Sequence, residues 1–181
     1  MEIRDLLIEV MQDQYDAEKQ LVKALPKMVK ASSNPELRQA FANHLEETKG
    51  HVERLDQAFG MVGVKAKGKP CAAMKGLIEE AQELVAKKME DELQDSGIIC
   101  AAQKVEHYEI AGYGTICAWA SAMGLDDVAE LLQETLDEEK AADEKLSQVA
   151  DEILVDAVAS GDEAERAPSK TRTAGSHRSE S

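Results

Sequence analysis

Apolar residues recur at intervals of three and four along most of the chain, which is the spacing of a helix with one buried face. This spacing predicts four long helices and one shorter helix, over about residues 2–31, 35–62, 98–123, 127–157 and 71–88. A Ser-Ser-Asn-Pro run at 32–35 and a glycine, Gly124, are typical of the turns that separate paired helices. No stretch alternates as a strand does, so we expect an all-α protein.

Three local signals refine the expected boundaries. Pro26 lies inside the first helical pattern and predicts a kink or a loosened last turn. Asp127 and Glu130 have the spacing of a capping box at the start of the last long helix. The polar stretch that ends at Ser96-Gly97 is expected to be a loop before the third long helix.

The order of the elements indicates how the chain is organised. Two pairs of long helices with short turns are joined by a long crossover, residues 63–97, that carries the short helix. This is the layout of a ferritin-like four-helix bundle, two antiparallel helical hairpins joined by a long crossover. We expect the bundle to span 1–159 and the polar residues 160–181, which have almost no large apolar side chain, to form a disordered tail. The apolar face of the short helix 71–88 either forms part of a dimer interface or packs across its own bundle.

The composition excludes several classes of partner. The chain has 36 acidic and 21 basic residues and a net charge of −15, which disfavours binding to nucleic acid or to an anionic membrane surface. No apolar run is long enough to span a membrane, and charges interrupt any signal peptide, so we expect a cytoplasmic protein. Cys71, Cys100 and Cys117 form no Cys-x-x-Cys pair, which argues against a disulfide framework or a zinc site.

The informative acids are those that fall on the apolar stripes of the four long helices. Unpaired carboxylates are costly to bury, so a group of them needs a cation, a shared proton or a polar network. The inward positions hold six acids and one histidine, namely Glu18, Glu47, His51, Glu106, Glu109, Glu139 and Asp143.

Pairs of these residues are also expected to lie at the same level along the axis of the predicted bundle. In an antiparallel hairpin, residues equally far from the turn lie side by side. Glu18 and Glu47 are centred on the turn at 32–33, and Glu109 and Glu139 are centred on Gly124. Two hairpins packed face to face would therefore gather the inward acids into one small volume. Carboxylate oxygens with an imidazole suit two iron or manganese ions.

Alternative interpretations remain for the flanking residues. His51 is either a ligand or a hydrogen-bonded histidine, and Asp143 is either a ligand or a surface ion-pair partner. His44 could bind metal or orient a ligand, although we favour a histidine at the edge of the core. Tyr113 either donates to a carboxylate or relays electrons, or it is a packed core residue. His107 is expected at the surface or at an interface.

Five stretches of the sequence resemble the YciE/YciF-type ferritin-like family, and the similarity as a whole covers residues 2–155. They are Tyr15-Asp-Ala-Glu18-Lys-Gln-Leu, His44-Leu-Glu-Glu47-Thr, Cys71-Ala-Ala-Met-Lys-Gly-Leu-Ile-Glu-Glu, Lys104-Val-Glu106-His-Tyr-Glu109-Ile-Ala and Asp137-Glu-Glu139-Lys-Ala-Ala-Asp143. The resemblance implies a ferritin-like bundle, commonly a homodimer, that is linked to bacterial stress responses and has a dinuclear metal site.

The sequence departs from the general di-iron pattern, which places Glu-x-x-His on two helices. Here the second helix offers Glu47-x-x-x-His51 and the fourth offers Glu139-x-x-x-Asp143. Fewer nitrogen ligands would favour hard, weakly held ions such as Mn(II) or Fe(II).

Two functions are consistent with these observations. The first is a stress protein with a dinuclear iron or manganese centre that reacts with peroxide or dioxygen. In it Glu47 and Glu139 or Glu109 bridge the ions, while Glu18, Glu106 and His51 are terminal ligands. The second is a non-catalytic dimeric interaction protein with a vestigial or proton-shared carboxylate cluster. Iron storage in a closed shell is disfavoured by the long tail and by the family resemblance.

Overall fold

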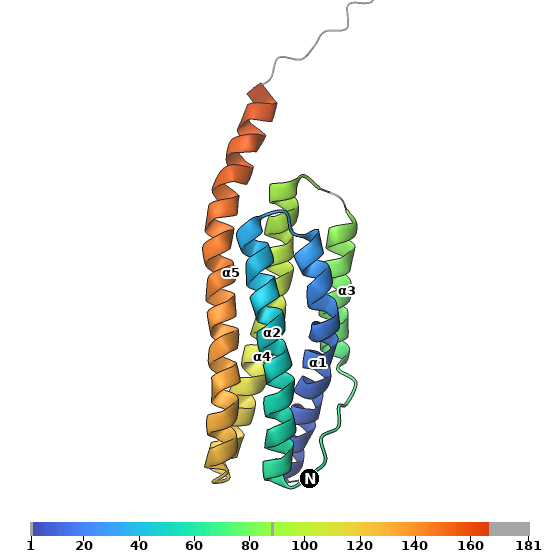
Figure 1. The fold of residues 1–181 in the computed structure, drawn as a ribbon, viewed down its shortest axis with the longest axis vertical. Coiled ribbons are helices and arrows are strands. Elements are labelled where there is room, and N and C mark those ends of the chain that lie inside the picture. The colour runs from blue at the N-terminus through green and yellow to red at the C-terminus, as the bar shows by residue number, and fades with distance from the viewer. Residues whose placement is uncertain (1, 88, 167–181) are drawn as a thin grey trace, which may run out of the picture.

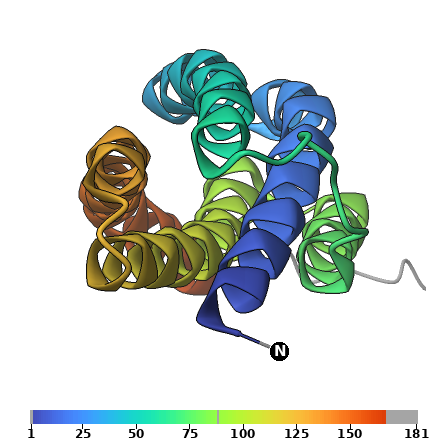
Figure 2. The ribbon, with the colours of Figure 1, turned by 90° about the horizontal axis from the view of Figure 1, so that it is seen from below.

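The computed structural model describes residues 2–87 and 89–166 and is built from five helices. They are α1 (Ile3–Ala31), α2 (Pro35–Val62), α3 (Ala72–Ala86), α4 (Asp91–Ala122) and α5 (Asp126–Arg166). The four long helices form an antiparallel bundle, and α3 packs outside it against α1 and α4 (Figures 1 and 2). The described residues contain no strand, and the prediction of an all-α, ferritin-like helical bundle is confirmed.

The turn between α1 and α2 is held by two side chains. Asn34 caps α2 by accepting hydrogen bonds from the backbone N–H groups of Glu36 and Leu37. Asp95, from α4, accepts hydrogen bonds from the backbone N–H groups of Ser33 and Asn34, at 2.9 and 2.6 Å. A side chain of the second hairpin therefore closes the turn of the first.

Two predicted helix starts are wrong. Helix α4 begins at Asp91 rather than near 98, so Ser96 and Gly97 are helical. A Cβ atom at Gly97 would lie 2.9 Å from the Leu84 side chain of α3, so the glycine permits a close approach of the two helices. Helix α5 begins at Asp126, and the carbonyl of Leu125 accepts its first hydrogen bonds, so Asp127 does not start a capping box.

Two further features concern the helix ends. Helix α1 runs through Pro26 to Ala31, which agrees with the predicted bounds 2–31. Helix α5 continues to Arg166, so the expected domain boundary at residue 159 falls inside a helix. The remainder of the predicted tail, 167–181, lies outside the described residues.

The core has two apolar clusters, one toward each end of the bundle. One contains Leu7, Phe59 and Leu132 and lies toward the turn at Gly124. The other contains Phe41 and Leu146 and lies toward the opposite end. Apart from Asp95 near the start of α4, the buried polar residues of the long helices lie where these two clusters meet. The fold thus places a polar layer in the middle of an apolar core.

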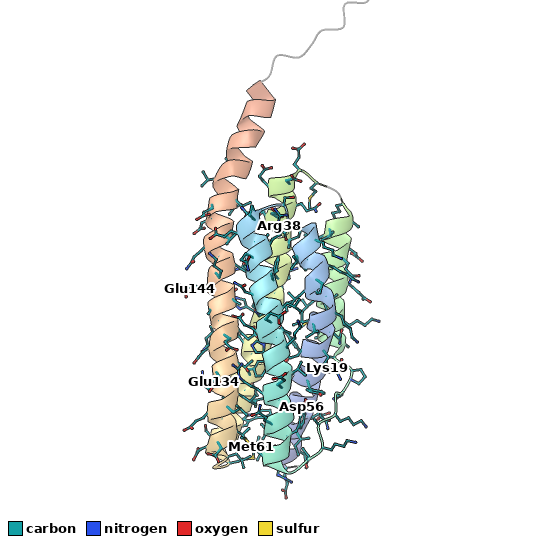
Figure 3. All side chains as sticks on the ribbon, viewed as in Figure 1. Lys19, Arg38, Asp56, Met61, Glu134 and Glu144 are labelled. Carbon is teal, nitrogen blue, oxygen red and sulfur yellow. The ribbon has the colours of Figure 1, made fainter. Side chains whose placement is uncertain are left out.

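The short helix α3 covers one side of its own bundle. Its apolar residues Leu77, Ile78, Leu84 and Val85 are partly buried against the second core cluster. Charged side chains such as Glu134 and Glu144 project from the outer face of α5 (Figure 3). Within the part of the chain that is described, none of the helices has the length and apolarity needed to cross a membrane.

Candidate metal centre

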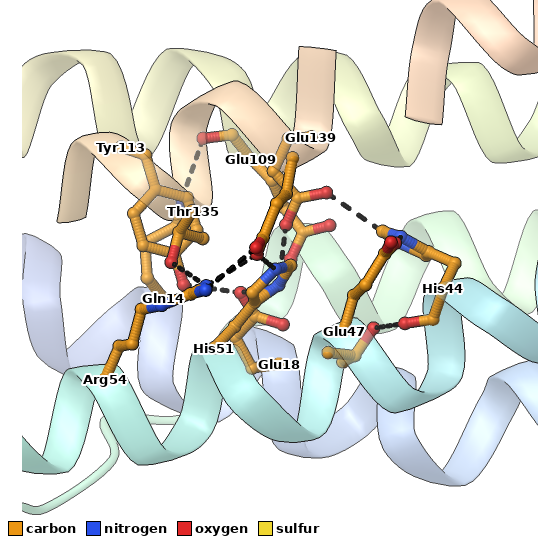
Figure 4. Close-up of polar contacts among 12 residues, drawn as sticks. Gln14, Glu18, His44, Glu47, His51, Arg54, Glu109, Tyr113, Thr135 and Glu139 are labelled. Carbon is orange, nitrogen blue, oxygen red and sulfur yellow. Dashed lines mark hydrogen bonds and ion pairs between the residues drawn. The ribbon is translucent and has the colours of Figure 1, made fainter. Parts of the chain in front are cut away.

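The polar layer is built by side chains from all four long helices (Figure 4). Its ionisable residues are almost fully buried, with between 0% and 5% of each residue exposed. They are Glu18 of α1, His44 and His51 of α2, Glu106 and Glu109 of α4, and Glu139 of α5.

These six residues form two overlapping groups that could each hold a metal ion. In the first group, His44, Glu106, Glu109 and Glu139 bring ligand atoms within 4.8 Å of one another. In the second, Glu18 and His51 do so together with Glu139. Since Glu139 belongs to both groups, its carboxylate lies where a bridge between two ions would be needed.

Many polar atoms of this layer have no hydrogen-bond partner. They include both carboxylate oxygens of Glu109 and of Glu139, one oxygen each of Glu18 and Glu106, and Nδ1 of His51. Buried polar atoms normally find partners, because leaving one unpaired costs roughly 1–3 kcal/mol. So many unpaired acceptors in one volume indicate that a cation or several protons belong there.

His51 is held by a carboxylate on its outer side. Its Nδ1 atom faces the cluster, 2.9 Å from Glu139 and 3.4 Å from Glu18. Its Nε2 atom lies 2.9 Å from Oε2 of Glu138. The two oxygens of this carboxylate each accept a hydrogen bond from one terminal nitrogen of Arg54. A histidine that donates one ring N–H to a carboxylate presents its other nitrogen as a ligand.

His44 repeats this arrangement with the ring turned the other way. Its Nε2 atom faces the cluster, 3.5 Å from Glu106 and 3.6 Å from Glu139. Its Nδ1 atom lies 3.3 Å from Oε2 of Glu47, whose side chain is 45% exposed. Each histidine therefore has one nitrogen directed at the buried carboxylates and one directed at a carboxylate nearer the surface.

The crowding of acids changes their protonation. Burial raises the pKa values of Glu106 and Glu109 well above their ordinary value, and it also raises the pKa of Glu139. Burial opposes protonation of His51, but the close approach of the Glu139 and Glu18 carboxylates to its Nδ1 atom outweighs this and raises its pKa to about 11. Without a cation, the layer is therefore expected to retain protons near neutral pH.

Two further buried side chains border the cluster. The hydroxyl of Tyr113 donates a hydrogen bond to Glu18. The amide of Gln14 donates to the backbone carbonyl of Glu109 at 3.2 Å. This contact depends on Gly112, where a Cβ atom would lie 1.9 Å from the Gln14 amide nitrogen.

The structure brings together five of the seven residues selected from the sequence: Glu18, His51, Glu106, Glu109 and Glu139. Glu47 lies at the edge, in contact with His44. Asp143 belongs to neither group. Its carboxylate instead accepts a hydrogen bond from Gln103 and lies 3.4 Å from the exposed His107.

Sequence reasoning placed His44 at the core edge and missed Arg54 and Glu138. The tandem acids Glu138-Glu139 could have indicated Glu138 as a residue beside the site, because neighbouring positions on a helix point about 100° apart. One of two such acids can enter the core while the other remains at its border. Tyr113 is a buried donor to a carboxylate, which was one of the alternatives considered for it.

The residues present fit a pair of divalent cations. Four carboxylates and two imidazoles are the donor set of ferritin-like di-iron proteins, although here both histidines lie on one helix. Including His44, the set offers two nitrogen ligands, rather than the single one expected from the sequence. Four carboxylate charges would balance two divalent ions, and the buried polar residues of the described chain include no lysine or arginine.

Together these features define a ferritin-like helical bundle with a buried carboxylate–histidine cluster at its centre. The chain belongs to the family described as Domain of unknown function (DUF892), whose pattern matches residues 2–159. It is 50% identical over 149 residues to protein YciF of Escherichia coli (strain K12), covering 82% of this chain and 90% of YciF.

Solved structures agree with this assignment. The crystal structure of the E. coli stress protein YciF matches with a TM-score of 0.82 and 49% identity, covering 84% of this chain and 97% of YciF. YcfI of Rhodopseudomonas palustris, provisionally described as a structural protein, matches with a TM-score of 0.79 and 46% identity, covering 81% and 94% of the two chains. A Xanthomonas campestris protein with 21% identity and a TM-score of 0.68, covering 89% of this chain and 99% of its own, supports the fold alone.

Proposed function

We propose that this chain is a stress-response metalloprotein whose polar layer binds a dinuclear iron or manganese centre that reacts with peroxide or dioxygen. The observation that carries the proposal is the set of unpartnered buried acceptors contributed by all four helices of the bundle. The description of the E. coli relative as a stress protein supports the physiological setting.

The ligand roles follow from the two groups of residues. His44, Glu106 and Glu109 would hold one ion, Glu18 and His51 would hold the other, and Glu139 would be shared. Bound iron or manganese would supply the change of oxidation state that reduction of peroxide or dioxygen requires.

The surrounding residues would orient the ligands and hold a proton. Glu138, fixed by Arg54, orients the ring of His51, and Glu47 orients the ring of His44. Tyr113 holds a proton on its hydroxyl oxygen, directed at Glu18. The two apolar clusters cover the layer toward both ends of the bundle and limit the access of water from there.

Metal content and peroxide consumption test this proposal. Protein purified without chelator and then treated anaerobically with Fe(II) or Mn(II) should contain about two ions per chain. Glu109→Gln and Glu139→Gln should lose metal and activity, while Glu134→Gln, which alters an exposed acid on α5, should behave as the unmodified protein. Protein that stays metal-free after both additions would contradict the proposal.

The second candidate is a non-catalytic interaction protein whose layer is filled by protons rather than by metal. The raised pKa values of Glu106 and Glu109 favour it, because they allow a proton-sharing network. The provisional description of the R. palustris relative is in line with it. Equal thermal stability with and without Fe(II) or Mn(II) would support this function.

Homodimer formation stays a prediction for both functions. Sedimentation or light scattering of the purified full chain tests it directly.

A further inference from the structure

An ion that binds the polar layer must first cross the wall of the bundle. Glu18, His51, Glu109 and Glu139 are each 0% exposed, so none of them can meet an ion at the surface. Two cavities in the described part of the chain reach the cluster, and both end at His44 and Glu106.

The first cavity lies between α2 and α5 and has a volume of about 380 Å³. Its lining combines apolar side chains such as Phe41 and Leu146 with six oxygen-bearing ones, namely Glu36, Gln39, Asn43, Glu47, Glu106 and Glu138. Lys145 is the basic residue in its lining and pairs with Glu36 at 2.9 Å. Glu47 and Glu138 add further negative charge to the lining, which attracts cations.

The second cavity lies between α1, α3 and α4 and has a volume of only about 40 Å³. Apart from His44 and Glu106, its lining consists of apolar side chains such as Leu21, Met28 and Ile78. A divalent cation would have to give up its water there without replacement ligands, which is prohibitively costly. The polar lining of the first cavity therefore makes it the favoured route for a cation, and the apolar lining of the second cavity disfavours that route.

Within the first cavity, Glu47 is best placed to receive an incoming ion. Glu138 already accepts two hydrogen bonds from Arg54, and Glu36 is paired with Lys145. The Glu47 side chain is 45% exposed and is in contact with His44 (Figure 4). Next along the path is Glu106, whose side chain is 4% exposed and whose Oε2 atom has no partner.

We propose that the cavity between α2 and α5 is the route by which divalent cations enter the buried cluster, and that Glu47 is a transit site on it. Glu47 binds the partly hydrated ion and passes it to Glu106 and His44. This inference rests on the proposed metal centre, but it assigns Glu47 to entry rather than to the resident ligand set.

Rates of Co(II) uptake into the metal-free full-length protein test the transit site. The visible absorption of bound Co(II), followed by stopped flow, gives the rate, and the final amplitude gives the stoichiometry. Glu47→Gln should slow uptake about tenfold, because the charge that attracts the ion is lost. The final amplitude at saturating Co(II) should be unchanged, because the amide oxygen of the glutamine can still accept from Nδ1 of His44. Glu46→Gln, the same change at the neighbouring, 70% exposed position, should load at the unmodified rate.

A second pair of variants tests the route itself. Ala142→Leu narrows the cavity between α2 and α5 and should slow uptake, whereas Ala102→Leu narrows the apolar cavity and should not. Circular dichroism checks that all four variants are folded.

Each contrary outcome has a distinct meaning. Normal uptake in both Glu47→Gln and Ala142→Leu would overturn the route while leaving the metal centre intact. A lower final amplitude in Glu47→Gln would make Glu47 a resident ligand and overturn the transit site. No uptake by the unmodified protein would overturn both this inference and the proposed function.

Discussion

Each inward-facing histidine depends for its orientation on a carboxylate that is not part of the buried cluster. Glu138 contacts Nε2 of His51, and Glu47 contacts Nδ1 of His44. Without such a contact an imidazole can rotate or change its tautomer and so lose its direction toward an ion. The partner carboxylates should therefore affect metal affinity although they are absent from both ligand groups.

Replacement of Glu138 measures this orienting effect. Glu138→Ala should weaken Mn(II) or Co(II) binding about 10–100-fold, because His51 loses the acceptor that fixes its ring. Glu138→Gln keeps an acceptor and should lose less. Competition titration gives the affinities, and Glu134→Ala is the control, since Glu134 also contacts Arg54 but is 65% exposed. Equal affinities of Glu138→Ala and Glu134→Ala would contradict an orienting role.

Glu109 links the cluster to the pH dependence of stability. Its pKa is raised by burial, so between the ordinary glutamate pKa of 4.5 and the folded value the folded state binds more protons than the unfolded state. The free energy of unfolding of the metal-free protein should therefore fall as the pH rises through this window.

Glu109→Gln cannot ionise and should remove part of this fall. At about pH 8 the metal-free variant should be more stable than the unmodified protein by roughly 1–3 kcal/mol, the cost of an unsatisfied buried polar group. Urea unfolding with chelator present, at about pH 5 and about pH 8, provides the comparison. Parallel pH profiles for the two proteins would show that Glu109 does not ionise unfavourably in the fold.

The sequence allowed the heights of the site residues to be predicted better than their directions. Distances from the two turns correctly placed Glu18, Glu109 and Glu139 in one layer. They did not define rotation about the helix axis, and the buried stripe of α2 passes through Thr48 rather than Glu47. The three-and-four spacing of His44, Thr48 and His51 with the apolar residues of α2 marks this stripe in the sequence, and Glu47 lies beside it. A side chain beside a stripe can turn inward or outward, and packing against neighbouring helices decides which.

At the scale of elements, α1 and α4 approach each other closely beside the cluster. The side chain of Gln14 lies against Gly112, and its amide bonds to the Glu109 carbonyl. Gln14 is only 1% exposed, so it has little room to move. The glycine is thus required by the neighbouring helix, although the middle of a helix ordinarily disfavours glycine.

A pair of glycine substitutions isolates this contact. Gly112→Ala should destabilise the protein by roughly 1–3 kcal/mol relative to Gly114→Ala, since a methyl group at 112 displaces Gln14, whereas no atom lies within 4 Å at 114. Thermal or urea unfolding of the metal-free proteins measures the difference. Combining Gly112→Ala with Gln14→Ala should recover much of the loss, and a purely additive double variant would argue against the contact.

Helix positions were predictable where turn residues mark them and less so where tertiary contacts extend a helix. The Ser-Asn-Pro turn and the glycines at 63 and 124, both in left-handed conformations, mark the observed ends of the long helices. The first turns of α4 were expected to be a loop because they are polar. There Asp95 is buried by its bonds to the α1–α2 turn, and Gly97 packs against α3. These long-range contacts stabilise helix that the local sequence does not favour.

At the scale of the whole molecule, the cluster joins the two hairpins. Glu18 and the two histidines come from the first hairpin, and the remaining ligands come from the second. Because the unfolded chain cannot assemble this set, bound metal should stabilise the fold by about 2.7 kcal/mol per ion at a free concentration 100 times Kd. Calorimetry with and without Mn(II) should show a raised Tm in the unmodified protein. Glu139→Gln should show no such rise, and an equal rise in both would place the bound metal elsewhere.

The bond from Asp95 to the turn between α1 and α2 has a consequence for how the bundle opens. Asp95 is 2% exposed and accepts from the amides of Ser33 and Asn34, which are about 60 residues away in the chain. Fraying of the first hairpin must therefore break a contact supplied by the second. Amide hydrogens in a surface turn usually exchange rapidly with solvent. In this protein those two should exchange only when the first turns of α4 separate from the α1–α2 turn, so their exchange rate reports the opening of the contact between the two hairpins.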